Sequence, residues 1–211
     1  VYGESAPYGK RKVIDATTIP QPANFYGDSK LQADVAVREL EDDTYKVIVL
    51  RPPMIYGKGS KGNYRTLVKL AKKLPIFPDV DNERSMLYIE NLCEFLCQIM
   101  LIKSYARNSV VLLPQNGEWT KTSDMIKMIA KASGKKIVES KGFAPAVWIG
   151  SKMPGKIGGL VNKAFGNNCY EHQISEYAGI RYQRTGLKDS VRKAEKDNKK
   201  ESKMDSEESH T

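Results

Sequence analysis

The strongest constraint on the fold is the run YKVIVLR, Tyr45 to Arg51, which two consecutive prolines end. A continuous apolar run of this kind is typical of a strand that is buried on both faces of a parallel sheet. The segment before it, Phe25 to Leu40, contains no proline and keeps apolar residues at near-helical spacing. A helix followed by a buried strand indicates a crossover unit, and therefore an α/β fold.

Shorter elements continue this alternation along the chain. Further helices are predicted at 63–74, 89–103, 122–133 and, as fragments broken by glycines and Pro154, 143–165. Further short strands are predicted at 1–3, 85–88, 109–114 and 135–142. Loops are predicted at 4–24 and 54–64, where glycine and proline accumulate. Thr122 or Ser123 is the expected cap of its helix, and Gly134 the expected stop.

The charge of the chain is unevenly distributed. The net charge is +9, and it lies in residues 1–185, because basic and acidic residues balance in 186–211. That last segment has almost no apolar residues, so we expect a disordered tail. A basic body suits anionic partners such as phosphorylated small molecules. No nucleic-acid-binding motif is present, and we expect no nucleic-acid partner.

No apolar run approaches the roughly 20 residues that span a bilayer, and no secretory signal opens the sequence. We therefore expect a soluble, cytoplasmic protein without a membrane partner. The three cysteines imply no disulfide framework. Cys93 and Cys97 lie one helical turn apart among apolar residues, so we expect both to pack in the core. No His, Cys or Asp cluster completes a metal site with them, and none is predicted.

Two Tyr-x-x-x-Lys patterns occur in the sequence. Tyr8 and Lys12 lie in a predicted loop, whereas Tyr26 and Lys30 lie in the first turns of a predicted helix, on one face. An ammonium near a phenol favours the phenolate and lowers the tyrosine pKa, which suits proton transfer at a hydroxyl or carbonyl. The alternative is an exposed lysine beside a half-buried tyrosine on a surface helix.

Four stretches in order, VYGE, FYGDSKLQAD, VIVLRPPMIYGKG and ERSMLYIENL, resemble the extended short-chain dehydrogenase/reductase family. This family includes the NAD-dependent epimerases and dehydratases of nucleotide-sugars, such as UDP-glucose 4-epimerase. The resemblance implies the C-terminal part of a Rossmann-type doubly wound sheet plus a small α/β substrate-binding domain. Residues 1–57 would end the nucleotide-binding domain, 58–185 would form mainly the substrate domain, and 186–211 the tail.

The resemblance assigns roles to individual residues. Tyr26 matches the catalytic tyrosine, which gives and takes the proton. Lys30 matches the lysine that binds the nicotinamide ribose of NAD and lowers the tyrosine pKa. NADP is an alternative cofactor, because the acidic or basic residue after the second strand that selects between the two is not among these residues. Pro53 falls where relatives line the nicotinamide.

Three further residues match positions that meet the substrate. Met54 falls where many relatives have a substrate-binding asparagine, so that polar contact is absent here. Asn63 falls near the nucleotide-sugar, and Arg84 matches an arginine that meets the substrate diphosphate, which a guanidinium binds with two hydrogen bonds. Without the family, an ion pair of Arg84 with Asp81 or Glu83 is an equal alternative.

The sequence also departs from the family. The glycine-rich G-x-x-G-x-x-G turn that seats the dinucleotide pyrophosphate is absent, and GKGSKG, Gly57 to Gly62, is better interpreted as a substrate loop. Asn91 stands where relatives have aspartate. We therefore expect the C-terminal part of such an enzyme, inactive alone, with a nucleotide-sugar as its partner and a homodimer contact through Phe25–Leu40. The alternative is a non-catalytic domain of the same fold that binds a nucleotide-sugar or a protein.

Overall fold

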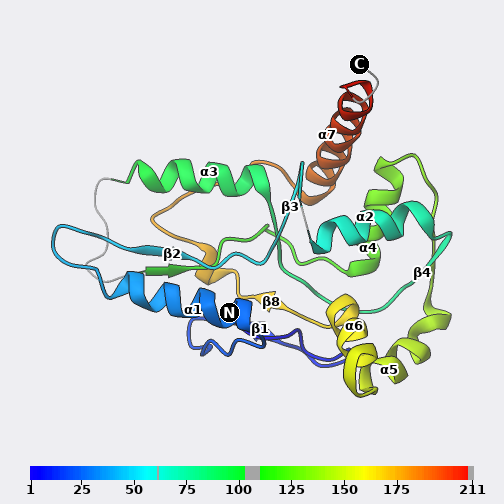
Figure 1. The fold of residues 1–211 in the computed structure, drawn as a ribbon, viewed down its shortest axis with the longest axis horizontal. Helices are drawn as coiled ribbons and strands as arrows, with labels where there is room; N and C mark the ends of the chain where they lie inside the picture. Colours follow the sequence, from blue (N-terminus) through cyan, green and yellow to red (C-terminus); the bar gives the residue numbers. More distant parts are fainter. Residues whose placement is uncertain (61, 103–109, 209–211) are drawn as a thin grey trace.

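The computed structural model describes residues 1–60, 62–102 and 110–208 (Figure 1). The strands are β1 Val13–Ile14, β2 Ile48–Leu50, β3 Met54–Tyr56, β4 Ile76–Pro78, β5 Met86–Tyr88, β6 Val110–Leu112, β7 Val138–Ser140 and β8 Cys169–Tyr170. The helices are α1 Phe25–Arg38, α2 Asn63–Lys73, α3 Ile89–Met100, α4 Thr122–Ala132, α5 Ala144–Lys152, α6 Gly155–Phe165 and α7 Leu187–Glu208. Two short 3₁₀ turns, Lys141–Phe143 and Gln173–Ser175, complete them.

The strands of the described residues form four parallel pairs, β1–β8, β2–β6, β3–β5 and β4–β7. The strand predicted at 45–51 is observed as β2, but its three residues are only half-buried, so the prediction of burial on both faces is wrong. Helix α3 lies on one side of the β2–β6 pair and α1 on the other (Figure 1). The parallel pairing and the covering helices confirm the α/β prediction, and the fold is of the Rossmann type.

The largest core cluster lies at the other end, where α2 and α4 pack together and α4 packs against α7. Its centre is formed by fully buried side chains, Tyr56, Tyr64, Met125, Ile126, Ile129 and Val191. A second cluster joins α3 to the β2–β6 pair through Phe95, Leu112 and Tyr182.

Two predictions are wrong, namely the loop at residues 54–56 and the strand at residues 1–3. Residues 54–56 form β3 and do not belong to the glycine-rich loop, because Tyr56 is fully buried and the glycines begin only at Gly57. Residues 1–3 form no strand. Gly3 has a φ of +74°, which turns the chain out of the extended conformation.

The predicted disorder of the tail is also wrong for the described residues up to 208, which form α7. Leu187, Val191 and Ala194 recur at helical spacing and are buried against α2 and α4. A low overall apolar content therefore concealed one narrow apolar stripe, which is sufficient to hold a helix on a core. The last three residues of that tail lie outside the described part of the chain, as do the predicted ends of two elements at Lys103 and Ser109.

Cys93 and Cys97 are exposed, so the prediction that they pack in the core is wrong. Helix α3 buries Asn91, Phe95 and Ile99, which recur every four residues. Both cysteines lie two positions away from this stripe and therefore on the opposite side of the helix. Among the helices that the structure describes, none is long and apolar enough to cross a membrane.

Candidate functional site

The Tyr26–Lys30 pair lies at the start of α1. Asn24 caps this helix, because its Oδ1 accepts a hydrogen bond of 2.9 Å from the backbone N–H of Gly27. Tyr26 follows in the first turn and is 70% exposed. The Lys30 ammonium lies 5.7 Å from the centre of the Tyr26 ring. The two residues are thus adjacent on an open helix face, as the sequence predicts.

In the second Tyr-x-x-x-Lys pattern, Tyr8 and Lys12, the lysine binds backbone groups. The Lys12 ammonium donates to the backbone carbonyls of Tyr2 and Glu4, at 2.6 and 2.8 Å. Burial lowers the Lys12 pKa from its ordinary value. Lys12 therefore fastens the N-terminal loop.

A cavity of about 590 Å³ lies between α1 and β2, and we name it the α1 cavity. Tyr26, Lys30 and Pro53 all line it. Its floor contains Arg51, whose Nε donates to Asp34 at 2.7 Å and whose Nη1 donates to the Tyr2 hydroxyl at 2.8 Å. The predicted catalytic and cofactor-side residues therefore share one cavity.

A second cavity, of about 240 Å³, lies between α2 and α6, and we name it the inner cavity. Met54, Asn63 and Arg84 all line it, although they come from three separate segments. The rest of the lining is mainly apolar, Leu67, Leu70, Met86, Leu160 and Ala164. The three predicted substrate residues are thus brought together.

A third cavity, of about 560 Å³, adjoins the inner cavity and shares Asn63, Arg84, Leu160 and Lys163 with it. We name it the outer cavity. Its lining is more polar and includes Asn24, directly before the α1 helix, and Lys156.

Arg84 stands where the inner and outer cavities meet. Its guanidinium donates to the backbone carbonyls of Lys163 and Ala164, and it lies 3.5 Å from the Ser5 hydroxyl. Burial lowers the Arg84 pKa from its ordinary value. The alternative of an ion pair is wrong, since Asp81 pairs with Lys121 and Glu83 with Arg11. Among the described residues, Arg84 therefore forms no ion pair with a carboxylate within 4 Å, although Glu4 also lines the outer cavity.

Helix α6 contributes lining residues that sequence reasoning missed, namely Lys156, Leu160 and Lys163. The α4 helix fixes the position of α6. Thr122, predicted to cap α4, lies inside the helix; its hydroxyl donates to the Ala164 carbonyl at 2.8 Å, and Lys121 occupies the cap position. One feature of the sequence could have indicated these cavity-lining lysines, because residues 141–166 contain lysines but no aspartate or glutamate.

The GKGSKG loop and Asn91, where the sequence departs from the family, make defined contacts in the structure. In the glycine-rich loop, the Gly59 N–H donates to the Asn198 side chain of α7 at 3.1 Å, so this loop contacts the C-terminal helix. Asn91 is buried; its Nδ2 donates to the Thr185 carbonyl at 3.0 Å, and its Oδ1 accepts from the Thr185 N–H at 3.1 Å. Asparagine can do both, whereas an aspartate carboxylate only accepts.

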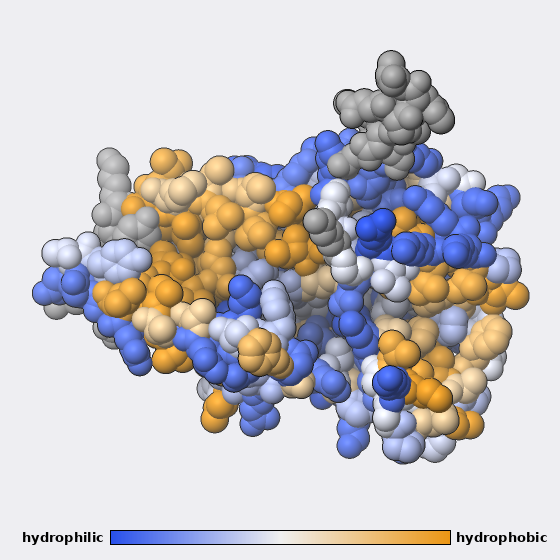
Figure 2. Space-filling view, viewed as in Figure 1, coloured by the Kyte–Doolittle hydropathy of each residue, from blue (hydrophilic) through white to orange (hydrophobic). Residues whose placement is uncertain are grey.

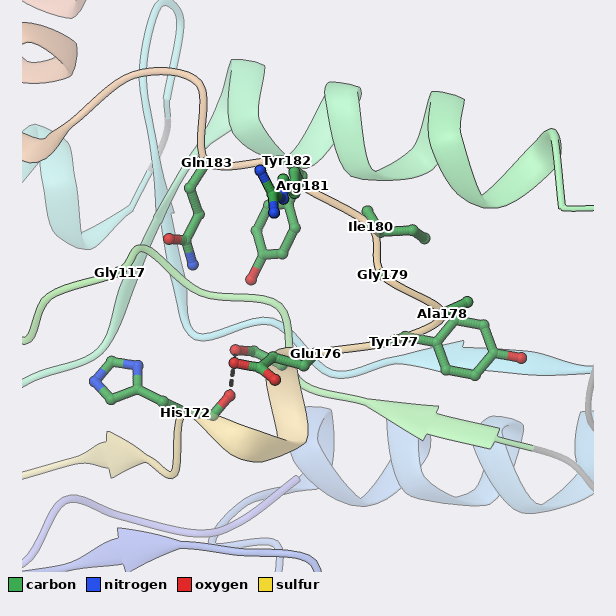
Figure 3. A pocket seen from close by; sticks show the side chains of 11 residues that line it. Gly117, His172, Glu176, Tyr177, Ala178, Gly179, Ile180, Arg181, Tyr182 and Gln183 are labelled. Carbon is green, nitrogen blue, oxygen red and sulfur yellow. Dashed lines mark hydrogen bonds between the residues drawn. The ribbon is translucent and has the colours of Figure 1, made fainter.

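Another cavity, of about 860 Å³, lies apart from the predicted site residues, none of which lines it, and we name it the Tyr182 cavity. Figure 3 shows Tyr182 and Gln183 on one side of it and His172 and Glu176 on the other. In residues 1–60, 62–102 and 110–208, no three His, Cys, Asp or Glu side chains are grouped to hold a metal ion.

The parallel α/β fold, and the Tyr-x-x-x-Lys helix beside the buried strand, define a Rossmann-type protein of the extended short-chain dehydrogenase/reductase class. Comparison with known proteins agrees with this class. The chain belongs to the family described as RmlD substrate binding domain, which matches residues 7–143.

Two relatives of known activity are similar in sequence. The UDP-glucose 4-epimerase of Vibrio cholerae is 30% identical over 118 residues, which cover 54% of this chain and 35% of that protein. The N-acetyl-alpha-D-glucosaminyl-diphospho-ditrans,octacis-undecaprenol 4-epimerase of Escherichia coli O157:H7 is 32% identical over 97 residues, 43% of this chain and 29% of that protein. The chain thus spans about a third of the length of these relatives.

Solved structures agree with the fold. The UDP-glucuronic acid 4-epimerase of Bacillus cereus, in complex with UDP-glucuronic acid and NAD, superimposes with a TM-score of 0.64 at 18% identity, over 95% of this chain and 59% of that one. RMD from Pseudomonas aeruginosa, complexed with NADPH, gives a TM-score of 0.62 at 18% identity, over 95% and 64%. The Thermus thermophilus UDP-glucose 4-epimerase with NAD gives 0.61 at 16% identity, over 93% and 60%.

Proposed function

We propose that this chain carries the catalytic pair and the substrate-binding part of an NAD-dependent epimerase or dehydratase that acts on a sugar diphosphate. One observation carries the proposal. Six residues selected by sequence fall into two sets, with Tyr26, Lys30 and Pro53 around the α1 cavity and Met54, Asn63 and Arg84 around the inner cavity. The first set contains the residues assigned to catalysis and to the cofactor, and the second set contains the residues assigned to the substrate.

The proposed chemistry of this chain's residues is proton transfer. The Lys30 ammonium stabilises a negative charge on the Tyr26 oxygen, so Tyr26 can take a proton from a sugar hydroxyl and return it. Pro53 and the apolar residues of β2 keep water from one side of the reacting atoms. When bound, NAD supplies the hydride acceptor and donor.

The fit to NAD is partial. The α1 cavity suits the nicotinamide and its ribose, because it combines Lys30 with an apolar wall. No glycine-rich turn that would seat the pyrophosphate occurs in the sequence, and the GKGSKG loop contacts α7. We therefore propose that the 211 residues alone bind NAD weakly and do not turn over substrate.

The proposed substrate class is a sugar joined to a diphosphate. Arg84 offers a guanidinium where the two substrate-side cavities meet, and Lys156 and Lys163 line the outer cavity beside it. Three cations suit a diphosphate, and the two similar epimerases are named for a UDP-sugar and for a diphosphate-linked sugar.

We also propose the predicted homodimer contact through α1, in the cytoplasm. Phe25 is 87% exposed, and Val35, Val37 and Leu40 are exposed as well.

The proposed domains remain residues 1–57 and 58–185.

Binding tests the substrate half of the proposal. Calorimetric titration of the 211-residue chain with UDP-glucose should show binding, and Arg84→Ala should weaken it at least about tenfold, because a charge-assisted hydrogen bond is lost. Arg181→Ala serves as the matched control, since Arg181 is exposed and lines the separate Tyr182 cavity. Equal affinities of the wild type and Arg84→Ala contradict the proposed role of Arg84.

Turnover tests the catalytic half. In a form of this protein that also carries a glycine-rich dinucleotide turn, Tyr26→Phe should lower turnover of a UDP-sugar by at least about a hundredfold and leave its affinity unchanged. Tyr8→Phe, in the other Tyr-x-x-x-Lys pattern, should leave turnover unchanged. UDP-sugar binding without NAD binding or turnover in that form supports the alternative, a non-catalytic nucleotide-sugar-binding domain.

A further inference from the structure

We propose that the hairpin of α5 and α6, residues 141–166, docks on the surface of an anionic lipid bilayer. This inference goes beyond the proposed function and does not depend on it. It rests on the charge of the hairpin, on its exposed apolar side chains and on the way the two helices are held together.

The hairpin is purely basic. Residues 141–166 contain four lysines and no aspartate or glutamate, in a chain that is 28% charged. All four lysines, Lys141, Lys152, Lys156 and Lys163, are exposed. Outside this segment, Glu4 lines the outer cavity beside Lys156 and Lys163. A cluster of lysines with no acidic residue in its own segment is attracted to an anionic membrane surface.

Large apolar side chains alternate with these lysines. Six of them are between 43% and 67% exposed, namely Phe143, Trp148, Ile149, Met153, Ile157 and Leu160. Figure 2 shows apolar residues gathered at the corner of the molecule that α5 and α6 occupy, with polar residues among them. A contiguous apolar patch of this kind on a folded domain marks an interaction surface.

Trp148 lies within this surface. The Lys152 ammonium lies 4.5 Å from the centroid of the Trp148 ring. Tryptophan and lysine together are typical of the bilayer interface, where the indole sits at headgroup level and the ammonium reaches lipid phosphates. Helices that lie in the interface need no spanning length, so the expectation of no membrane partner, which rests on the absence of a spanning run, does not address this mode.

The two helices form a fixed platform. The Asn162 side chain donates to the Ser151 carbonyl at 3.0 Å. A Cβ at Gly158 would lie 1.9 Å from the Met153 carbonyl oxygen, so only glycine permits this approach of the helices. Val147 is buried. The exposed side chains therefore stay exposed while the inward face holds the hairpin together.

Charge favours a lipid surface over a second copy of this chain. Two copies that met through this hairpin would bring their lysines together, which is unfavourable. Helix α1, which also exposes apolar side chains, differs in this respect, since Glu39, Glu41 and Asp42 follow it directly. Anionic lipid satisfies both the charge and the apolar area of the hairpin.

The docked orientation has a consequence for the cavities. Lys156, Leu160 and Lys163 belong to the hairpin and also line the outer cavity. A bilayer under the hairpin would therefore lie beside the mouth of that cavity.

Vesicle co-sedimentation of the full 211-residue chain tests the proposal. The chain should bind vesicles of equimolar phosphatidylcholine and phosphatidylglycerol and leave vesicles of phosphatidylcholine alone unbound. The double variant Lys152→Gln/Lys156→Gln should weaken partitioning about twenty-five-fold, since each lysine near an anionic surface contributes about fivefold. Trp148→Ser/Ile149→Ser should also release the chain.

Two matched controls make the test specific. Lys188→Gln/Lys196→Gln removes the same charge from α7, far from the hairpin (Figure 1), and Met100→Ser/Leu101→Ser removes exposed apolar area at the end of α3. Both should bind as the wild type does. Circular dichroism establishes that each variant is folded.

Three results would overturn the proposal: no sedimentation of the wild type with anionic vesicles, equal losses in the hairpin and control variants, or a dimer that the hairpin variants dissociate without any lipid binding. Loss of UDP-glucose binding with lipid binding intact would contradict only the proposed function.

Discussion

The Tyr64 hydroxyl in α2 donates a hydrogen bond of 3.0 Å to the Glu195 carboxylate in α7, and both side chains are buried. Burial, followed by the charge of Glu195, raises the Tyr64 pKa well above its ordinary value. The same carboxylate lies 3.6 Å from the Lys72 ammonium and 3.3 Å from the Ser133 hydroxyl. A polar network thus joins the C-terminal helix to the core.

Removing the donor of this bond should destabilise the protein. Tyr64→Phe leaves the buried Glu195 carboxylate with fewer partners and should lower the free energy of unfolding by about 1–3 kcal/mol. Urea denaturation measures the change, and Tyr45→Phe, at an exposed tyrosine, is the control. Identical unfolding midpoints for the two variants would show that the bond contributes nothing.

The buried part of α7 should be indispensable and its end dispensable. A chain that ends after Gly186 loses Leu187, Val191 and Ala194 from the largest core cluster and should unfold or bind a hydrophobic dye. A chain that ends after Lys199 keeps all of these contacts and should retain the wild-type melting temperature. If both truncated chains melt alike, α7 does not stabilise the core.

Replacing Asn91 with the residue that relatives carry should be harmful here. Asn91→Asp removes the donor to the Thr185 carbonyl and buries a carboxylate, so the free energy of unfolding should fall by about 1–3 kcal/mol at neutral pH. The loss should shrink when acid protonates the aspartate, which restores a donor. Chemical denaturation at two pH values measures this, and a loss that does not depend on pH argues against the mechanism.

The Asp34–Arg51 pair should make stability depend on pH. Burial acts to raise the Asp34 pKa, but hydrogen bonds from Arg51 and Arg38 outweigh it and hold the pKa below its ordinary value of 3.8. The folded state therefore binds the proton less readily than the unfolded state. The stabilisation is complete above the ordinary value and is lost as pH falls through the lowered pKa.

Comparison with Asp34→Asn isolates this contribution. The wild type should be more stable than the variant by about 1.5–3 kcal/mol at pH 7, and this difference should decrease below about pH 4. Urea denaturation across the acid range provides the curve. A difference that stays constant down to the most acidic pH would contradict the assignment.

The three thiols should differ in reactivity. Cys93 and Cys97 are exposed on α3, whereas Cys169 is buried in β8, where burial raises its pKa to about 12. Only thiolates attack disulfide reagents, so two thiols should react rapidly at pH 8 and the third only after denaturation. Absorbance of the released thiol counts them, with Cys169→Ser as the control that keeps two fast reactions. Three rapid equivalents would contradict the burial of Cys169.

Local patterns predicted the elements that matter most for the site. The α1 helix and β2 could be recognised because a long uninterrupted periodic segment favours a helix, whereas a short apolar run that is rich in β-branched residues and ends at prolines favours a strand. Residues 54–56 were missed because a three-residue strand is recognisable only through its distant partner, β5. The apolar stripe of α7 was diluted by the charged residues around it.

The cavity-lining residues show the same limit of prediction from sequence. Motifs select some of these residues, but tertiary packing decides where they lie. The family resemblance selected Arg84, but its placement depends on carbonyl groups of α6, about 80 residues further along the chain. Lys156 and Lys163 belong to no motif, so only the packing of α6 against α4 reveals that they line the same cavity. The exposure of Cys93 and Cys97 depends on which face of α3 meets the sheet, and sequence spacing alone does not choose between the two faces.

The pairing of β1 with β8 places constraints on how the chain acquires its structure during synthesis. Val13 pairs with Cys169 and Ile14 with Tyr170, so among the described strands β1 finds its partner only after the segment around residue 170 has left the ribosome. Contacts between such distant segments form slowly, and the unpaired strand stays exposed meanwhile. The N-terminal segment with its Tyr26–Lys30 helix should therefore be the part that most depends on a chaperone.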